Sequence, residues 1–222
     1  MKTFPLVEIF GPTIQGEGAD IGRLSTFIRF AGCDFSCEWC DSQFAADVKS
    51  ARQVTAAHIM DELCLHQRTE WIVITGGNPL LYELSDLVDA LHSANYKIAV
   101  ETQGSIYKDW VTECDLVNLS PKPPSARARS SDNLGRFLTM CKCSVKMVAF
   151  DDKDLHYIVM LKRTYPKSDF IVSVGSRKSD TTTSYLHRYK TVLELVAKDP
   201  ALNDVRVLPQ MQFILWGRRR GV

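Results

Sequence analysis

The chain has 222 residues, of which 45% are hydrophobic, enough for one sizeable core and too few for two independent enzymatic domains. Its 27 lysines and arginines almost balance 26 aspartates and glutamates, and the resulting net charge of +1 argues against broad electrostatic capture of nucleic acid or a membrane. We therefore expect a single domain, residues 1–222, that acts on a small or locally recognised partner, with no direct nucleic-acid binding and no membrane association.

The first residues, MKTFPLVEIFGP, carry one lysine and a short apolar run that Pro5, Glu8 and Gly11 interrupt. This pattern is not typical of a signal or transit peptide, and no stretch of the chain approaches the roughly 20 apolar residues of a membrane span. The sequence thus predicts a cytoplasmic protein. In that reducing compartment the seven cysteines are expected to be thiols or metal ligands and not a disulfide framework.

Apolar runs and amphipathic segments alternate along the chain. The apolar runs predict strands at residues 4–10, 25–31, 71–75, 97–101, 115–120, 143–149, 169–175 and 205–209. Apolar residues at three- and four-residue steps predict helices at residues 55–67, 84–95, 154–165 and 183–199. Alternation of this kind is typical of an α/β fold with parallel strands and crossover helices. The chain lacks the length for eight full units, so we expect a partial, open (β/α) barrel.

Two stretches fit no regular element and are predicted to be loops. Residues 11–22 carry four glycines and a proline, and residues 121–136 are proline-rich and then polar. Loops at the carboxyl ends of parallel strands are where such folds bind their ligands, so both are expected near a functional site.

Three cysteines lie close together in the stretch GCDFSCEWCDS, residues 32–42. Cys33, Cys37 and Cys40 have the spacing C-x3-C-x2-C, one ligand short of the four that a structural zinc site uses. The residues that could complete such a site from a distance are His58, His66, Cys64 and Cys114. The alternative is a cubane 4Fe-4S cluster, whose fourth iron then stays open to a substrate or cofactor.

The same stretch resembles the signature of the radical S-adenosylmethionine superfamily, C-x3-C-x-aromatic-C, with Trp39 as the aromatic residue. The resemblance implies that Cys33, Cys37 and Cys40 hold a 4Fe-4S cluster and that the amino and carboxylate groups of S-adenosylmethionine bind the open iron. An electron from the reduced cluster then breaks the sulfonium bond and gives a 5'-deoxyadenosyl radical. Trp39, Cys40 and Asp41 are expected to contact S-adenosylmethionine.

Two predicted strand ends carry motifs that match the same superfamily. ITGGNP, residues 74–79, resembles its GGE-type motif, which implies that the backbone of Gly77 receives the amino group of S-adenosylmethionine. Asn78 stands where glutamate is commoner, so a role for its side chain stays open. LSPKP and ETQG end two further strands; the second fits a simple strand cap equally well. The first offers a hydroxyl and a cation suited to a carboxylate, and its expected cofactor contacts are Ser120, Pro121 and Lys122.

The first loop narrows the resemblance to one family. IFGPTIQGEG (9–18), FIRFAGC (27–33) and CDS (40–42), together with the ending VLPQMQFILWGRRRGV (207–222), are similar to the 7-carboxy-7-deazaguanine synthases of the queuosine pathway, a source of modified tRNA. The likeness runs from about residue 5 to the last residue. It implies a lyase that converts 6-carboxy-5,6,7,8-tetrahydropterin into 7-carboxy-7-deazaguanine with loss of ammonia, by a radical ring contraction.

The family resemblance assigns substrate-binding residues. Arg29 matches the arginine that holds the substrate carboxylate, a task for which its planar fork is suited. Glu17 is a candidate for the guanidine-like edge of the pterin, and a capping or loop role fits it as well. The other positions expected to contact the substrate are Ile14, Gln15, Gly16, Thr75 and Val222. The sequence assigns no acid or base to the final proton transfer.

The resemblance also implies a metal ion and two partners. Ser42 occupies the position of a serine or threonine that binds Mg²⁺, an ion that prefers hard oxygen ligands and shares them with substrate. A homodimer and an electron donor such as a flavodoxin or ferredoxin are expected. Arginines 218–220 are too few for strong phosphate binding and are expected on a solvated face or a dimer interface. The remaining cysteines, expected to be buried small apolar residues, are Cys64, Cys114, Cys141 and Cys143.

Two rival interpretations use the same cysteines. An activating enzyme for a glycyl-radical protein would share the three thiols and the double glycine, but it would not call for the QGEG loop or for Arg29, and it would need a protein-sized docking groove. A zinc-stabilised binding module would have no enzymatic activity.

Overall fold

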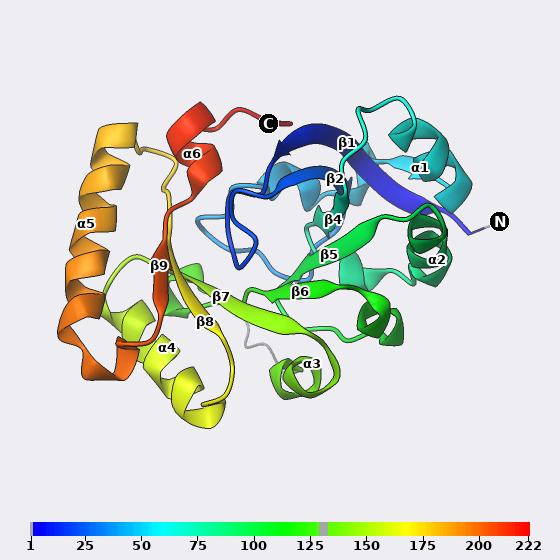
Figure 1. Ribbon diagram of the computed structural model, residues 1–222. Helices are drawn as coiled ribbons and strands as arrows, with labels where there is room; N and C mark the ends of the chain where they lie inside the picture. Colours follow the sequence, from blue (N-terminus) through cyan, green and yellow to red (C-terminus); the bar gives the residue numbers. More distant parts are fainter. Residues whose placement is uncertain (1, 129–132) are drawn as a thin grey trace.

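The computed structural model describes residues 2–128 and 133–222, and their strands form one mixed sheet at the centre of the molecule (Figure 1). The strands are β1 (Phe4–Ile14), β2 (Leu24–Phe30), β3 (Arg52–Val54), β4 (Trp71–Gly76), β5 (Lys97–Thr102), β6 (Leu116–Leu119), β7 (Cys143–Ala149), β8 (Phe170–Val174) and β9 (Arg206–Leu208). The α-helices are α1 (Ala56–Leu63), α2 (Ser85–Ser93), α3 (Leu134–Met140), α4 (Asp152–Thr164), α5 (Thr182–Lys198) and α6 (Met211–Trp216).

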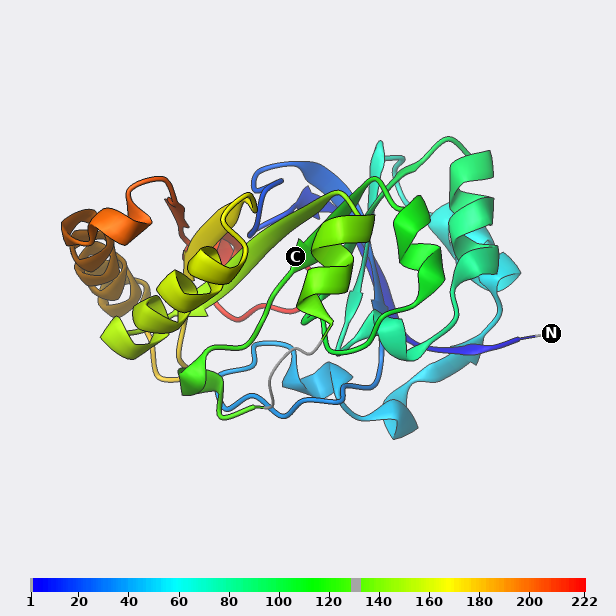
Figure 2. The ribbon, with the colours of Figure 1, turned by 90° about the horizontal axis from the view of Figure 1, so that it is seen from below.

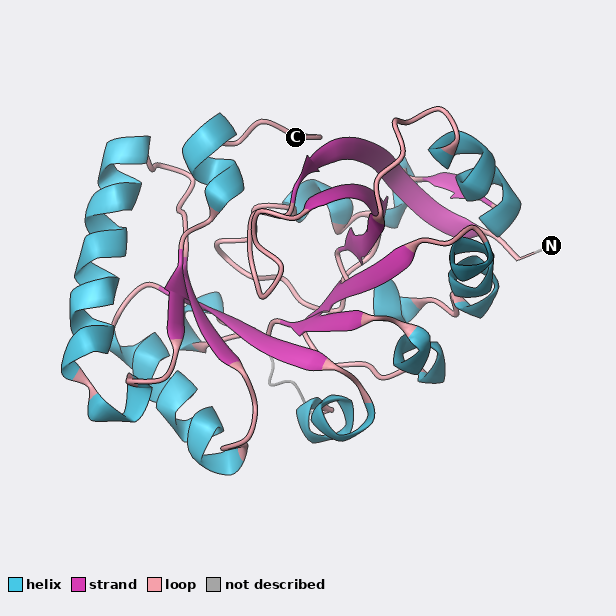
Figure 3. Cartoon of the chain, viewed as in Figure 1, coloured by secondary structure: helices cyan, strands magenta, loops and turns pink. Residues whose placement is uncertain are grey.

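The sheet is open. Its strand order is β3-β1-β2-β4-β5-β6-β7-β8-β9, so among the described strands the edges β3 and β9 do not meet. Strands β2 and β4 to β9 run parallel, whereas β1 is antiparallel to both of its neighbours. Figure 3 shows the strands fanned across the middle of the molecule with the helices outside them. The predicted partial, open (β/α) barrel is confirmed.

Burial follows from the position of each element in this sheet. All of β8 is buried, because a parallel strand is covered on both faces. Helix α2 turns one apolar face inward through Leu87, Val88 and Leu91, and each fully buried leucine contributes about 1.5–3 kcal/mol relative to exposure. None of the helices in the described residues combines the length and the apolar character needed to cross a membrane.

Most predicted elements are confirmed to within a few residues at their ends, and the exceptions are short. The sequence missed β3, a three-residue strand at the sheet edge, and it missed α3 and α6, which are too short to establish a helical period. The predicted loop at 11–22 is wrong at its start, because β1 continues to Ile14. The predicted loop at 121–136 contains the 3-10 helix η5 (Pro124–Ala126) and the first turn of α3, and residues 129–132 of it lie outside the described residues.

The connections after the parallel strands gather at one edge of the sheet. In Figure 2 the light-blue chain that follows β2 runs along the lower side of the view, separate from the green and yellow helices α3 and α4. The chain ends close to the same region after α6, as Figure 1 shows. Carboxyl ends of parallel strands are the usual ligand-binding edge of such folds, and the candidate site lies there.

Candidate functional site

One cavity of about 400 Å³ opens at this edge, within the usual size range of small-molecule sites. The predicted site residues that line it are Ile14, Gln15, Gly16, Glu17, Arg29, Cys33, Cys37, Trp39, Cys40, Asp41, Ser42, Thr75, Gly77, Ser120, Lys122 and Val222. Pro121 does not line the cavity and is buried between its two lining neighbours. Residues far apart in the sequence thus meet around one space.

The thiol loop, residues 33–42, forms one wall of the cavity. Cys37 packs with Phe35 and Ala126 in a small apolar cluster, and Cys33 and Cys40 lie against it. The Phe35 backbone N–H donates to Sγ of Cys33 at 3.4 Å, and the Cys40 N–H donates to the Cys37 carbonyl at 3.2 Å. Hydrogen bonds of the N–H···S type stabilise ligand sulfurs in iron–sulfur proteins and tune their reduction potential.

The chemistry of these thiols fits a cluster. Burial raises the pKa of all three, to about 11 for Cys40, while the nearby Lys122 ammonium opposes the shift. Thiols with a raised pKa stay protonated at neutral pH, so they become thiolates when a metal displaces the protons. Three soft sulfur ligands beside a cation and an open cavity suit a 4Fe-4S cluster with one accessible iron.

A zinc site fits less well. In residues 2–128 and 133–222, no three histidine, cysteine, aspartate or glutamate side chains converge on a position for a single ion. Zinc needs four ligands on one centre, whereas cluster cysteines bind different irons and stand further apart. None of the distant zinc candidates borders the cavity; these are His58, His66, Cys64 and Cys114. The zinc interpretation therefore lacks its fourth ligand.

Two glycines at the end of β4 allow the thiol loop to pack against the sheet. A Cβ on Gly77 would lie 2.1 Å from the carbonyl oxygen of Gly32, and one on Gly76 would lie 2.2 Å from that of Phe30. No side chain fits at either distance, so the close approach of the two backbones requires glycine. Gly77 lines the cavity directly beside the start of the thiol loop.

Asn78 has a structural role instead of a cavity contact. Its side chain is fully buried and does not line the cavity. It donates to Oδ1 of Asp34 at 2.8 Å and accepts from the Leu80 N–H at 3.2 Å and the Thr102 hydroxyl at 3.0 Å. Asn78 therefore caps the 3-10 helix η3 (Pro79–Leu81) and ties it to the thiol loop, at the position where the superfamily commonly has glutamate.

The ammonium group of Lys122, which follows β6, lies beside the ring of Trp39 from the thiol loop. Nζ of Lys122 donates to Oγ of Ser120 at 3.0 Å and lies 5.7 Å from the ring centroid of Trp39. The indole N–H of Trp39 donates to Oγ of Ser125 at 3.1 Å, which holds the ring in place. Burial and the charge of Lys146 lower the pKa of Lys122. A cation beside a flat ring suits a ligand that carries both a carboxylate and an aromatic base.

The floor of the cavity is a buried polar network. Its members, called the cavity floor below, are Gln15, Glu17, Glu101, Lys146, Gln210 and Gln212. Lys146 of β7 pairs with Glu17, whose other oxygen accepts from the side-chain amides of Gln210 and Gln212. Burial opposes ionisation of both partners, but Lys146 holds the pKa of Glu17 below its usual range, and Glu17 with Glu101 raises the pKa of Lys146. The floor is therefore a charged pair at neutral pH.

Glu101, at the end of β5, joins two of the predicted substrate contacts. Its oxygens accept from the amide of Gln15 at 2.8 Å and from the hydroxyl of Thr75 at 2.6 Å. The amide oxygen of Gln15 in turn accepts the Glu17 backbone N–H at 3.1 Å. The ETQG motif contained the signal for Glu101, because a polar group directly after a buried strand lies at the ligand-binding edge.

Arg29 reaches the cavity from β2. Its Nε donates to Oε1 of Glu8 at 2.9 Å and its Nη1 donates to Oγ of Ser42 at 3.3 Å. These bonds use two of the five guanidinium N–H groups, so the remaining donors can meet a carboxylate. The Ser42 hydroxyl donates to Oδ1 of Asp41 at 2.9 Å, which places two hard oxygen groups side by side.

Several residues that line the cavity were not predicted from the sequence. Strongly polar residues inside largely apolar strands, Asn118 in LVNL and Lys146 in CSVKMVA, were the available signal for two of them. The lining residues that the sequence did not single out as site residues include Glu101, Asn118, Lys146, Gln210 and Gln212. Arginines 218–220 are exposed, as expected of a solvated face, but they also border the cavity.

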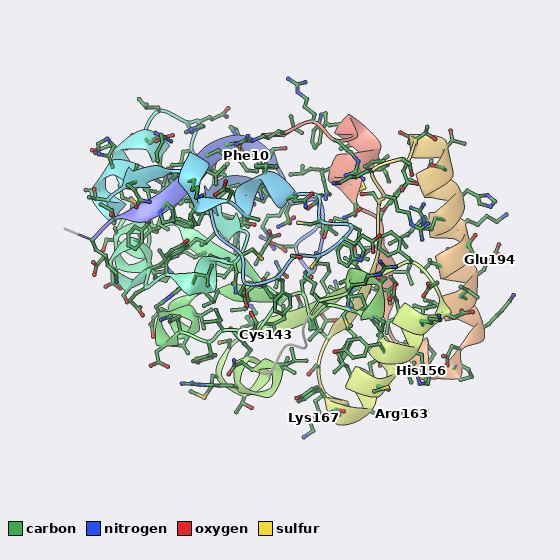
Figure 4. The ribbon with its side chains drawn as sticks, turned by 180° about the vertical axis from the view of Figure 1, so that it is seen from behind. Phe10, Cys143, His156, Arg163, Lys167 and Glu194 are labelled. Atoms are coloured by element: carbon green, nitrogen blue, oxygen red, sulfur yellow. The ribbon has the colours of Figure 1, made fainter. Side chains whose placement is uncertain are left out.

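The other four cysteines do not all follow the prediction of burial. Cys114 lies in the main core, but Cys64 is exposed and Cys141 and Cys143 are only half-buried. The last two lie at the short connection from α3 to β7, where Figure 4 labels Cys143, and both pack against the main core. Because α3 was not anticipated, this junction was not either.

The fold and the site together define an iron–sulfur enzyme of the radical S-adenosylmethionine type. Residues 14–120, which include all three cysteines of the thiol loop, match a family described as a 4Fe-4S single cluster domain. The crystal structure of QueE from Escherichia coli superposes with a TM-score of 0.74 at 20% identity, covering 94% of each chain. SuiB from Streptococcus suis, in a structure bound to S-adenosylmethionine, gives a TM-score of 0.55 at 13% identity over 85% of this chain and 50% of that one.

Sequence relatives identify the particular family. The 7-carboxy-7-deazaguanine synthase of Bacillus subtilis is 41% identical over 100% of this chain and 99% of its own length, and that of Bacillus cereus is 38% identical over 100% of both. The chain belongs to the 7-carboxy-7-deazaguanine synthase family.

Proposed function

We propose that this protein converts 6-carboxy-5,6,7,8-tetrahydropterin into 7-carboxy-7-deazaguanine with loss of ammonia, as a carbon–nitrogen lyase. The observation that carries the proposal is the single cavity that joins three thiols on one wall to a carboxylate-binding arginine and a charged amide floor on the others. Family membership supports the same reaction, because the relatives that the chain covers from end to end carry the name of the product.

The cofactor end of the cavity is assigned to the thiol loop and to two strand ends. Cys33, Cys37 and Cys40 would hold the cluster. When bound, the cluster would supply one electron to S-adenosylmethionine and so generate a carbon radical. The open backbone at Gly77 would receive the amino group of S-adenosylmethionine. Its carboxylate would pair with a cation beside an aromatic ring, and the expected contacts there are Trp39, Asp41, Ser120, Pro121 and Lys122.

The substrate end is assigned to Arg29 and the cavity floor. The unused N–H groups of Arg29 would hold the pterin carboxylate, and the guanidine-like edge of the ring would pair with the two floor carboxylates, Glu17 and Glu101. Gln15 and Thr75 donate hydrogen bonds to Glu101 in the structure. The N–H groups of a ligand at that carboxylate would replace these donors, so Glu101 would keep its hydrogen bonds. The remaining substrate contacts are expected at Ile14, Gly16 and Val222.

Water exclusion is part of the proposed task, because a radical on the substrate must not meet solvent. Apolar side chains that line the cavity supply it, the stacked rings of Phe10 and Phe27 from β1 and β2 and the side chain of Val148 from β7. The protein thus contributes orientation, charge and a shielded space to the ring contraction.

We further propose a magnesium ion at Ser42 that is shared with the substrate carboxylate. The adjacent Asp41 supports it, since carboxylate and hydroxyl oxygens are the ligands that Mg²⁺ prefers. The expected role is template and charge stabiliser for the carboxylate that Arg29 also holds.

The partners proposed are an acidic electron donor, such as a flavodoxin or ferredoxin, and a second copy of the chain. Support for the donor comes from exposed cations around the cavity: arginines 218–220 line it, and Lys178 donates to Gln43 at 3.0 Å. Support for a homodimer comes from the family and from Leu186 and Leu193, exposed on one face of α5.

An anaerobic assay of the reconstituted protein tests the proposal. The mixture contains reductant, S-adenosylmethionine, Mg²⁺ and 6-carboxytetrahydropterin, and product is followed by mass and ultraviolet absorbance. Formation of 7-carboxy-7-deazaguanine is expected. If 5'-deoxyadenosine accumulates without it, the substrate assignment is wrong and another radical reaction, such as glycyl-radical activation, takes its place; if neither forms and the protein binds zinc, the enzyme assignment fails.

A further inference from the structure

One acidic residue of β1 holds two arginines that are far apart in the sequence. Oε1 of Glu8 accepts from Nε of Arg29 at 2.9 Å, and Oε2 of the same carboxylate accepts from Nε of Arg220 at 2.8 Å. The side chains of Glu8 and Arg29 are only 17% and 14% exposed, so their ion pair is shielded from solvent. Glu8 therefore links the arginine that reaches the cavity to the segment that follows α6.

That segment, residues 217–222, is called the strap below. Gly217 and Gly221 adopt positive φ values of 62° and 71°, which turn the chain back toward β1. The strap borders the cavity along its whole length, and the guanidinium of Arg220 lies 4.1 Å from the ring centroid of Phe44. Gly221 approaches Phe10, which Figure 4 labels beside the end of the chain. The strap thus rests on a strand of the sheet and on two aromatic rings.

The charges of this group favour an anionic ligand. Two arginines share one carboxylate, so the trio Glu8, Arg29 and Arg220 carries a net charge of +1. Without Arg220, the negative charge of Glu8 would cancel the positive charge of Arg29, and the net charge of the group would be zero. Arg29 also lies 5.5 Å from the Phe44 ring that Arg220 covers, so both guanidinium groups contact the same apolar surface.

We propose that Glu8 and Arg220 are positioning residues for the substrate carboxylate: their ion pair latches the strap over the cavity, and the same Glu8 carboxylate fixes the guanidinium of Arg29. This inference rests on the proposed function. It assigns a role to two residues that the reaction itself does not require, and it couples closure of the cavity to the orientation of its carboxylate-binding group.

The first test measures the strap directly with trypsin, because three of its six residues are arginines. Anaerobically purified holoenzyme is digested, and cleavage after Arg218 and Arg219 is followed by mass spectrometry. Glu8→Gln and Arg220→Gln are expected to speed this cleavage about ten-fold, since each removes a charge-assisted hydrogen bond from the latch. The matched control is Glu194→Gln on the outer face of α5, which Figure 4 labels and which should be cleaved at the wild-type rate. Wild-type cleavage rates in both test variants would overturn the latch.

The second test separates positioning from a purely structural role. Both variants are expected to raise KM for 6-carboxytetrahydropterin about ten-fold with kcat changed less than about two-fold, because the arginine is misplaced while the reacting groups remain. The double variant should have the same KM as Glu8→Gln alone, since Glu8→Gln already breaks the pair with Arg220. Arg220→Lys keeps the charge and should recover part of the lost KM. Faster strap cleavage with an unchanged KM would overturn the positioning role.

The two proposals fail in different ways. No turnover by the wild-type holoenzyme refutes the proposed function, whereas normal wild-type turnover with unchanged KM in Glu8→Gln and Arg220→Gln refutes the latch alone.

Discussion

The thiol loop and the cavity floor face the same cavity but are built in opposite ways. The thiol loop is one contiguous, irregular stretch in which Asp34, Ser36, Glu38 and Asp41 are exposed. The cavity floor draws its six residues from separate segments between Gln15 and Gln212, and hydrogen bonds and an ion pair link them at buried and half-buried positions. The loop therefore depends on the fold for its position, whereas the floor is itself part of what holds the fold together.

Because of this difference, function and stability are separable in the thiol loop but not in the cavity floor. A cysteine of the thiol loop contributes a sulfur ligand for the cluster and little buried area, so replacing it should leave the protein folded. A charged residue of the floor contributes to both, because a buried charge without its partner is strongly destabilising.

Replacing Cys37 by alanine should abolish activity and leave the fold intact. The cluster would lose one of three ligands, while the side chain packs only in the small cluster with Phe35 and Ala126, outside the main core. Product formation is expected to fall below about 1% and bound iron to fall with it, whereas the free energy of unfolding of the metal-free protein should change by less than about 1.5 kcal/mol. Cys64→Ala, at an exposed thiol, is the control. Full iron content in Cys37→Ala would contradict the ligand assignment.

Replacing Glu17 by glutamine should destabilise the whole protein. Lys146 would keep its charge in a buried position without the carboxylate that pairs with it, at a cost of about 3–5 kcal/mol. Urea unfolding measures this loss. Glu70→Gln removes the matching half of the exposed pair with Lys97 and should leave the free energy of unfolding almost unchanged, because solvent screens that pair. If the two variants are equally stable, the cavity floor is not structural and the comparison with the thiol loop fails.

Replacing Gly77 or Gly16 by alanine should affect the thiol loop and the cavity floor differently. At Gly77 the new Cβ would meet backbone of the thiol loop, at 2.1 Å from the Gly32 carbonyl, so the loop must move; a cost of about 1–3 kcal/mol and a lower iron content are expected. At Gly16 the nearest atom is the side-chain amide oxygen of Gln212, at 1.9 Å, which can rotate away. Gly16→Ala should therefore retain iron and lose about 1 kcal/mol, roughly the value of the hydrogen bond that Gln212 gives to Glu17. Equal iron loss in both variants would mean that Gly77 does not position the thiol loop.

The ion pair between Asp180 and Arg188 belongs to neither region, and its loss is expected to have the smallest effect on stability. Asp180 accepts from both Nη atoms of Arg188, and these bonds hold the pKa of Asp180 down at about 2, from an ordinary value of 3.8. A depressed carboxyl pKa stabilises the protein above pH 3.8, and this contribution is lost as the pH falls toward 2. Asp180→Asn should cost about 1 kcal/mol at pH 7 and less at pH 3, by chemical unfolding at both values. A cost that grows in acid would have the wrong sign.

The fold was predictable where the sequence repeats a pattern over enough residues. Strands such as β4 and β8 are continuous apolar runs, and α5 spans four turns with an apolar stripe, so period and length agree. Strand β3 and helices α3 and α6 have three to seven residues, fewer than a period can establish. Their existence depends on the elements they pack against, which a local pattern does not contain.

The chemistry of the thiol loop could be predicted from a short stretch of sequence, because three ligands with a fixed spacing act within it. Motifs at strand ends also pointed to Gln15, Arg29 and Thr75 as site residues. Their partners became visible only in the folded chain: Glu101 lies between Gln15 and Thr75, and Glu8 pairs with Arg29. A buried charge is tolerated only beside its counterpart, and the fold can bring that counterpart from anywhere in the chain, so no local pattern contains it.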